Sequence, residues 1–119
     1  DRYARLLTTV GGVPPIADVV HLGIGADGHT ASLVPGDPVL RVGDRWIALA
    51  GPYQGRHSMT FTYPTINAGR LVVWQVSDGD KAAALRAALQ GNGVPASKVR
   101  RRGVHVIATH AAAAHLDGR

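Results

Sequence analysis

The sequence of 119 residues contains no cysteine, which excludes a disulfide framework and any metal site built on thiolates. It contains no glutamate either: its 8 acidic residues are all aspartate, against 13 basic residues, for a net charge of +5. No apolar run approaches the ~20 residues of a membrane-spanning helix, and residues 1–20 lack the features of a signal peptide. We therefore expect no membrane partner. The content of 45% hydrophobic and 18% charged residues predicts a folded chain.

The positive net charge suits an anionic partner, such as a phosphorylated metabolite or a nucleic acid. The basic residues are dispersed, however, and their single cluster, residues 100–102, has no aromatic residues between its arginines for base stacking. We interpret this cluster as a solvated loop edge before a strand. The sequence thus favours a small phosphorylated ligand over nucleic acid.

Apolar strand-like segments alternate with helical segments along the chain, and turns rich in glycine and proline separate them. Strands are predicted at residues 18–24, 46–50, 58–63, 71–76 and 104–108. Helices are predicted at residues 2–7, 64–70, 81–90, 95–99 and 110–116, with one helical turn at 30–33. The first strand is apolar on both faces, as in a strand that is covered on both sides. The alternation predicts an α/β fold with a mostly parallel sheet flanked by helices.

The glycine-rich segment from Gly23 to Gly36, which follows the first strand, carries the most chemistry. In an open α/β sheet, ligands bind beyond the carboxyl ends of the strands, where this loop must lie. Its glycines, Gly25 and Gly28 among them, let backbone N–H groups approach a ligand closely. His29 has the side-chain type whose ordinary pKa lies nearest neutrality, which suits a general base. Asp27, two residues earlier, is placed to orient the loop or the imidazole.

Several other readings of this loop fail on its residue order. The Gly-x-Gly pair does not continue as a dinucleotide-binding fingerprint, and no Lys-Ser or Lys-Thr completes a nucleotide phosphate loop. Ser32 is not flanked as Gly-x-Ser-x-Gly, the pattern of many serine hydrolases. The 6 histidines are spread along the chain, and His110 and His115 miss the spacing of helical zinc ligands. We therefore expect no metal site.

The loop, read as GIGADGHTASLVPG, closely resembles the signature of the 6-phosphogluconolactonase family. The resemblance continues through residues 59–67, residues 77–82 and the alanine-rich C-terminal segment, and so covers nearly the whole chain. It implies a Rossmann-like α/β fold shared with sugar-phosphate deaminases and isomerases. It also implies a cytoplasmic enzyme, without cofactor or metal, that hydrolyses 6-phosphoglucono-1,5-lactone to 6-phosphogluconate in the pentose phosphate pathway.

The resemblance also implies roles for individual residues. His29 would act as the general base on water, with Asp27 as its partner, while Gly25 and Gly28 would approach the substrate. Lys81, at the start of a predicted helix, matches a lysine that contacts phosphate in the related deaminases. Many members carry a phosphate-binding arginine where this sequence has Ser58. Either Arg56 substitutes from two residues upstream, or phosphate binding relies on groups elsewhere.

Two alternatives remain open beside the lactonase. Glucosamine-6-phosphate deaminases share the Asp-Gly-His of the loop but place a functional glutamate before the final Pro-Gly, where this sequence has Val34. Family members are also about twice as long, and the chain begins with Asp1 rather than Met. We therefore expect residues 1–119 to be the C-terminal part of a single, incomplete lactonase-like α/β domain. Such a chain would need its missing N-terminal half or self-association, or would be a non-catalytic sugar-phosphate-binding fragment.

Overall fold

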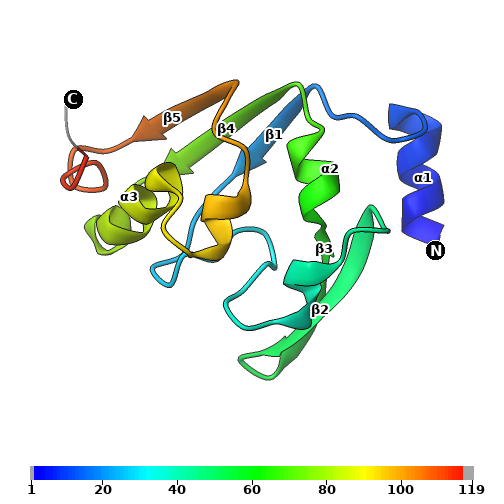
Figure 1. Ribbon diagram of the computed structural model, residues 1–119, viewed down its shortest axis with the longest axis horizontal. Coiled ribbons are helices and arrows are strands. Elements are labelled where there is room, and N and C mark those ends of the chain that lie inside the picture. The colour runs from blue at the N-terminus through cyan, green and yellow to red at the C-terminus, as the bar shows by residue number, and fades with distance from the viewer. Residues whose placement is uncertain (1, 117–119) are drawn as a thin grey trace.

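The computed structural model describes residues 2–116 and contains two sheets with helices packed against them (Figure 1). The strands are β1 Val19–Leu22, β2 Ile47–Tyr53, β3 Arg56–Phe61, β4 Leu71–Val76 and β5 Val104–Ala108. The α-helices are α1 Arg2–Gly11, α2 Tyr63–Asn67 and α3 Ala82–Gln90. Three 3₁₀ helices complete the elements: η1 Pro38–Arg41, η2 Gly79–Lys81 and η3 Pro95–Lys98. Every predicted strand is present, which confirms the α/β class.

The first sheet is parallel and has the order β1-β4-β5, while β2 and β3 form a separate antiparallel hairpin. Strand β4 is central, and its alternate residues Val72, Trp74 and Val76 are at most 2% exposed. They pack into one apolar cluster with residues from β1, α2 and α3. The parallel pairing places the carboxyl ends of β1 and β4, and hence the loops that follow them, at the same edge of the sheet.

Helices cover only one face of this sheet within residues 2–116. Figure 1 shows α3, η3 and α2 on the same side as the hairpin. On the other face, Val19 is 54% and Ile107 is 61% exposed, and His21 is exposed with its Nε2 2.8 Å from Gln75 Oε1. The prediction that the first strand is covered on both sides is therefore wrong in the described chain, because β1 has no element packed on its second face.

Two predicted helical segments adopt other structure. Residues 110–116 form successive turns, in which the Ala114 N–H donates to Ala111 O and the Leu116 N–H to Ala113 O. Alanine favours a helix, but propensity alone does not hold a segment this short in helical form. Its contact with the core, through Ala112 at 0% exposure, is made from a turn. The predicted helical turn at 30–33 is instead a tight β-type turn closed by paired backbone hydrogen bonds between Thr30 and Leu33. Ala31 stands there at a φ of +50°.

The remaining helix predictions are confirmed, with shifted boundaries. The helix predicted at 81–90 begins as η2 and continues as α3, and Gly91 ends it in the left-handed conformation at a φ of +74°. Leu85 and Ala88 are buried in the apolar cluster that includes β4. No helix in the described residues is long and apolar enough to cross a membrane.

Candidate active site

The loop after β1 is held in shape by its own hydrogen bonds. The Thr30 hydroxyl donates to Gly23 O at 2.8 Å, and the Gly25 N–H donates to His29 O at 2.9 Å. The Gly28 N–H in turn donates to Gly25 O at 2.9 Å. These short-range contacts close the chain around the segment from residue 25 to residue 29 and present its two polar side chains on one side.

Asp27 and His29 form a hydrogen-bonded pair within this loop. Asp27 Oδ1 accepts from the His29 backbone N–H at 3.0 Å and lies 2.6 Å from His29 Nδ1. Because a carboxylate can only accept, the contact places a proton on Nδ1, and the neutral form of the ring then carries its lone pair on Nε2. In residues 2–116, Nε2 of His29 has no hydrogen-bond partner. The pair thus has the arrangement of a base with its orienting group.

The pKa of Asp27 reflects the same contacts. Partial burial opposes the carboxylate form, but the hydrogen bonds from the His29 backbone and ring, with a further one from Tyr53, outweigh it. The net effect holds the pKa of Asp27 below its ordinary value of 3.8. Asp27 is therefore a carboxylate throughout the neutral range and keeps its role as an acceptor for the imidazole.

The two predicted loop glycines have steric reasons to be glycine. A Cβ on Gly25 would lie 2.2 Å from His29 Cε1, so only glycine lets the imidazole rest over that residue. Gly28 has a φ of +86°, and a Cβ there would lie 2.3 Å from the Cβ of Val94. The structure thus shows Gly25 and Gly28 shaping the site; their contact with a substrate stays a prediction.

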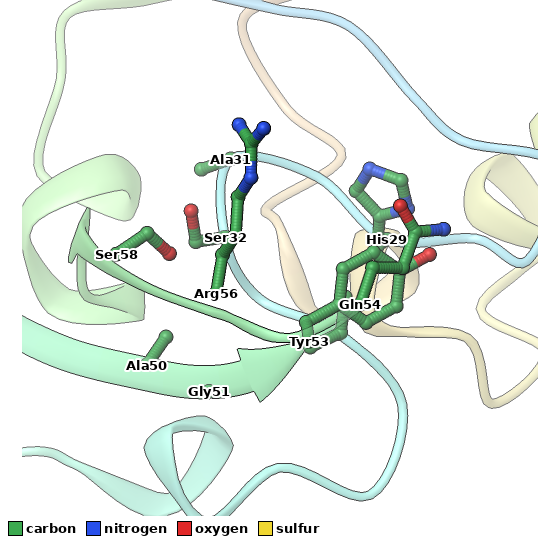
Figure 2. A pocket seen from close by; sticks show the side chains of 10 residues that line it. His29, Ala31, Ser32, Ala50, Gly51, Tyr53, Gln54, Arg56 and Ser58 are labelled. Atoms are coloured by element: carbon green, nitrogen blue, oxygen red, sulfur yellow. The ribbon is translucent and has the colours of Figure 1, made fainter.

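His29 borders a pocket of about 510 Å³, within the ~300–1,000 Å³ typical of small-molecule sites. The hairpin forms the opposite wall. Figure 2 shows the Arg56 side chain extending from β3 toward the glycine loop, with the Tyr53 ring beside His29. The other pocket-lining residues are Ala31, Ser32, Val34, Ala50, Gly51, Gln54 and Ser58.

Arg56 and Ser58 lie on the same face of β3, since residues two apart along a strand share a face. The side chain of an arginine at position 56 can therefore reach the same pocket as a side chain at position 58. The structure thus places Arg56 in the pocket; its contact with a phosphate stays a prediction.

Lys81 lies elsewhere. It is the half-buried residue at the N-cap of α3, at the carboxyl edge of the sheet, and it does not line the pocket. Its predicted role as a phosphate ligand stays a prediction.

Asn67 has a structural role, because its Oδ1 accepts from the Arg100 N–H at 2.8 Å and its Nδ2 donates to Lys98 O. Within residues 2–116, no three His, Asp or Glu side chains are grouped as metal ligands.

Sequence reasoning missed Tyr53, whose hydroxyl donates to Asp27 Oδ2 at 3.3 Å and whose ring centroid lies 5.8 Å from that of His29. One sequence feature, the Gln54-Gly55 pair, could have indicated the hairpin turn that follows Tyr53. Gln54 and Gly55 have φ values of +50° and +76°, the geometry of a tight two-residue hairpin turn. A Gln-Gly pair between two strands was weak evidence for that turn, which pairs Tyr53 with Arg56 across the hairpin.

Comparisons with known proteins place the chain among related proteins. A family described as glucosamine-6-phosphate isomerases/6-phosphogluconolactonase matches residues 1–108. A 6-phosphogluconolactonase of a Synechocystis species is 49% identical over 85 residues, which are 71% of this chain and 35% of that protein. The enzyme of the same name from Rattus norvegicus is 37% identical over 108 residues, 86% of this chain and 42% of that protein.

A solved structure of 6-phosphogluconolactonase from Trypanosoma brucei has the same fold, with a TM-score of 0.84 and 24% identity. The match covers 97% of this chain and 51% of that one. The chain thus spans about a third to a half of the length of these relatives.

Proposed function

The chain belongs to the family of glucosamine-6-phosphate isomerases and 6-phosphogluconolactonases, and on this basis we propose that it catalyses hydrolysis of 6-phospho-D-glucono-1,5-lactone to 6-phospho-D-gluconate. One observation carries the proposal: the Asp27–His29 pair leaves Nε2 free beside a pocket that also holds the cation of Arg56. The 49% identity to a lactonase supports the choice of substrate.

In the proposed reaction, Nε2 of His29 removes a proton from water as the water oxygen attacks the lactone carbonyl carbon. The tetrahedral intermediate then collapses, and the bond to the ring oxygen breaks. The imidazolium returns its proton to that oxygen, which leaves as the hydroxyl of the open-chain acid. Asp27 stabilises the transient imidazolium through its contact with Nδ1.

The phosphate and the developing oxyanion need separate donors. We assign the phosphate to Arg56, because a guanidinium binds phosphate through paired N–H groups. The N–H groups of Gly25, Gly28 and His29 already donate within the loop. The oxyanion would therefore be met by other donors of the pocket, such as the hydroxyl of Ser32.

The deaminase alternative lacks support at one position. Val34, which stands where the deaminases have their glutamate, lines the pocket and is 6% exposed. Residues 1–119 contain no glutamate that could take over this role. An apolar side chain cannot exchange a proton with an amine or a ring oxygen, so the pocket fits lactone hydrolysis better than deamination.

The phosphate assignment predicts unequal effects for two cations. Arg56→Ala should raise KM for the lactone about 10- to 100-fold, since a charge-assisted contact to phosphate is lost. If Arg56 alone binds the phosphate, Lys81→Ala, outside the pocket, should change KM less than threefold. Steady-state kinetics on both variants decides between them. A larger effect at Lys81 than at Arg56 would move the phosphate site to the start of α3.

We also propose that the complete site needs polypeptide that the longer relatives carry beyond the matched part. Within residues 2–116, β1 pairs only with β4, so its second edge is free beside an apolar groove of about 420 Å³ that runs along α1. Val10 and Val19, which line this groove, are 85% and 54% exposed. A free edge with apolar surroundings is a template for another strand.

This docking can be measured directly. The additional segment of the Synechocystis relative, added to this chain, should form a one-to-one complex by size-exclusion chromatography with light scattering. Val19→Asp should weaken that complex at least tenfold, whereas Leu49→Asp, on an exposed site of β2 outside the groove, should not. A homodimer of this chain that excludes the added segment would show self-association instead.

Lactone hydrolysis is then assayed on the chain alone and on this complex. Hydrolysis well above the spontaneous rate in either form supports the proposed function. If the lactone is hydrolysed only at the spontaneous rate in both forms, the proposed function is overturned. The remaining alternative is then a non-catalytic sugar-phosphate-binding fragment. Release of ammonia from glucosamine 6-phosphate would establish the deaminase.

A further inference from the structure

Asp27 uses its two carboxylate oxygens for different partners. Oδ1 takes both hydrogen bonds from His29, while Oδ2 accepts from the hydroxyl of Tyr53. In the described chain, Tyr53 is the only group bonded to Oδ2. The carboxylate is therefore held from both sides, by its own loop on one side and by the hairpin, 26 residues away in sequence, on the other.

A β-bulge points Tyr53 toward this carboxylate. Ala50 pairs with Ser58 and Tyr53 pairs with Arg56, so residues 51–52 of β2 stand opposite the single residue His57 of β3. Ordinary alternation would put residues 50 and 53 on opposite faces of the hairpin. The extra residue reverses this and turns Tyr53 to the pocket side.

The bulge is anchored to the rest of the molecule. Gly51, at a φ of +108°, donates its N–H to Asp37 Oδ2 at 2.8 Å, and a Cβ at this position would lie 2.6 Å from Arg56 O. Asp37 Oδ1 in turn accepts from the Val39 N–H at the start of η1. The tip of the hairpin therefore has a defined position relative to the glycine loop.

We propose that Tyr53 is a positioning residue for the Asp27–His29 pair, and that the bulge in β2 exists to place it. Its hydroxyl fixes the rotation of the carboxylate so that Oδ1 stays aligned with Nδ1, and its ring borders one side of the imidazole (Figure 2). This inference rests on the proposed function for its catalytic consequence. The contact itself can be tested without any activity.

The direct test follows the ionisation of Asp27 by carboxyl ¹³C NMR in this chain. The groups that face this carboxylate are His29 and Tyr53, and Arg56 lines the same pocket. Tyr53→Phe keeps the ring and removes the hydroxyl that helps to lower the pKa of Asp27. That pKa should therefore rise toward 3.8 in the variant.

Tyr63→Phe is the matched control. It removes a phenolic hydroxyl that donates to Pro95 O at 2.7 Å and has no contact with Asp27. This variant should lower the melting temperature but leave the titration of Asp27 unchanged. Tyr53 is 38% exposed, so Tyr53→Phe should fold normally.

In whichever form hydrolyses the lactone, the chain alone or its complex with the added segment, Tyr53→Phe should lower kcat about tenfold, as expected for loss of a hydrogen bond to a charged group. KM should stay within twofold, because Tyr53 acts through Asp27. An unchanged Asp27 titration would overturn the proposal whatever the activity, and so would a shifted titration with unchanged kcat. If the parent chain proves inactive as a lactonase, the proposed function fails, while the NMR titration still decides whether Tyr53 holds Asp27.

Discussion

His29→Gln should lower the turnover of 6-phosphogluconolactone by about 10²–10⁴-fold, the usual contribution of a general base. Glutamine occupies a similar volume and can keep a hydrogen bond to Asp27, but it cannot accept a proton at neutral pH. His29 lies at the surface of the pocket, with 32% of its side chain exposed. The substitution should therefore leave the fold intact, and KM should change little.

The measurement is the initial rate of acid release at constant pH, corrected for spontaneous hydrolysis. His105→Gln makes the same change at an exposed position of β5 that does not line the pocket. This control should keep full activity, and both variants should unfold at the temperature of the parent chain. Turnover of His29→Gln within a factor of a few of the parent rate would remove His29 from the mechanism.

Asp27→Ala should lower kcat by about 10²–10³-fold, because the imidazole loses both its orientation and its counter-charge. Asp27→Asn separates these two effects. The amide oxygen can take the place of Oδ1 and still accept both hydrogen bonds from His29, so the orientation and the Nδ1–H tautomer persist. Only the stabilisation of the imidazolium by charge is lost, and kcat should fall about tenfold.

The order of these effects is the test, measured as kcat at saturating lactone. Equal losses for both substitutions would mean that charge alone matters at position 27. Full activity in Asp27→Ala would show that the hydrogen bond to Nδ1 has no part in catalysis. Asp44→Ala, at an exposed position outside the pocket, is the control for loss of an aspartate.

The same pair predicts a pH dependence of stability. The pKa of Asp27 is lower in the folded chain than its ordinary value of 3.8. Its contribution to stability is therefore fully present above pH 3.8 and disappears as the pH falls through the folded value. Below about pH 4, the parent chain should lose stability relative to Asp27→Asn in urea unfolding. A constant difference between pH 6 and pH 2 would contradict the lowered pKa.

The sequence predicted the strands well, because each of them is a continuous run of apolar or alternating residues. It did not predict how they are covered. Strand β1 reads as buried on both faces, yet Val19 and His21 are exposed in the described chain. Apolar residues on both faces of a strand show that it can be buried on both sides, but not that other elements cover it. Which elements then pack on it depends on contacts between segments far apart in the chain.

The sequence by itself determined the Asp27–His29 pair. The two residues are separated by one glycine, their hydrogen bonds lie within a single turn, and Gly25 leaves room for the ring. Contacts of such short range need little beyond the local backbone, so the motif alone predicted them.

Only the tertiary structure decided what surrounds that pair. Tyr53 and Arg56 reach the pocket because the hairpin folds back on itself, and a bulge changes the face on which Tyr53 stands. Lys81 lies outside the pocket although its loop shares an edge of the sheet with the glycine loop. Pairing, register and the placement of a hairpin against a loop 26 residues away arise from long-range packing, which no short motif encodes.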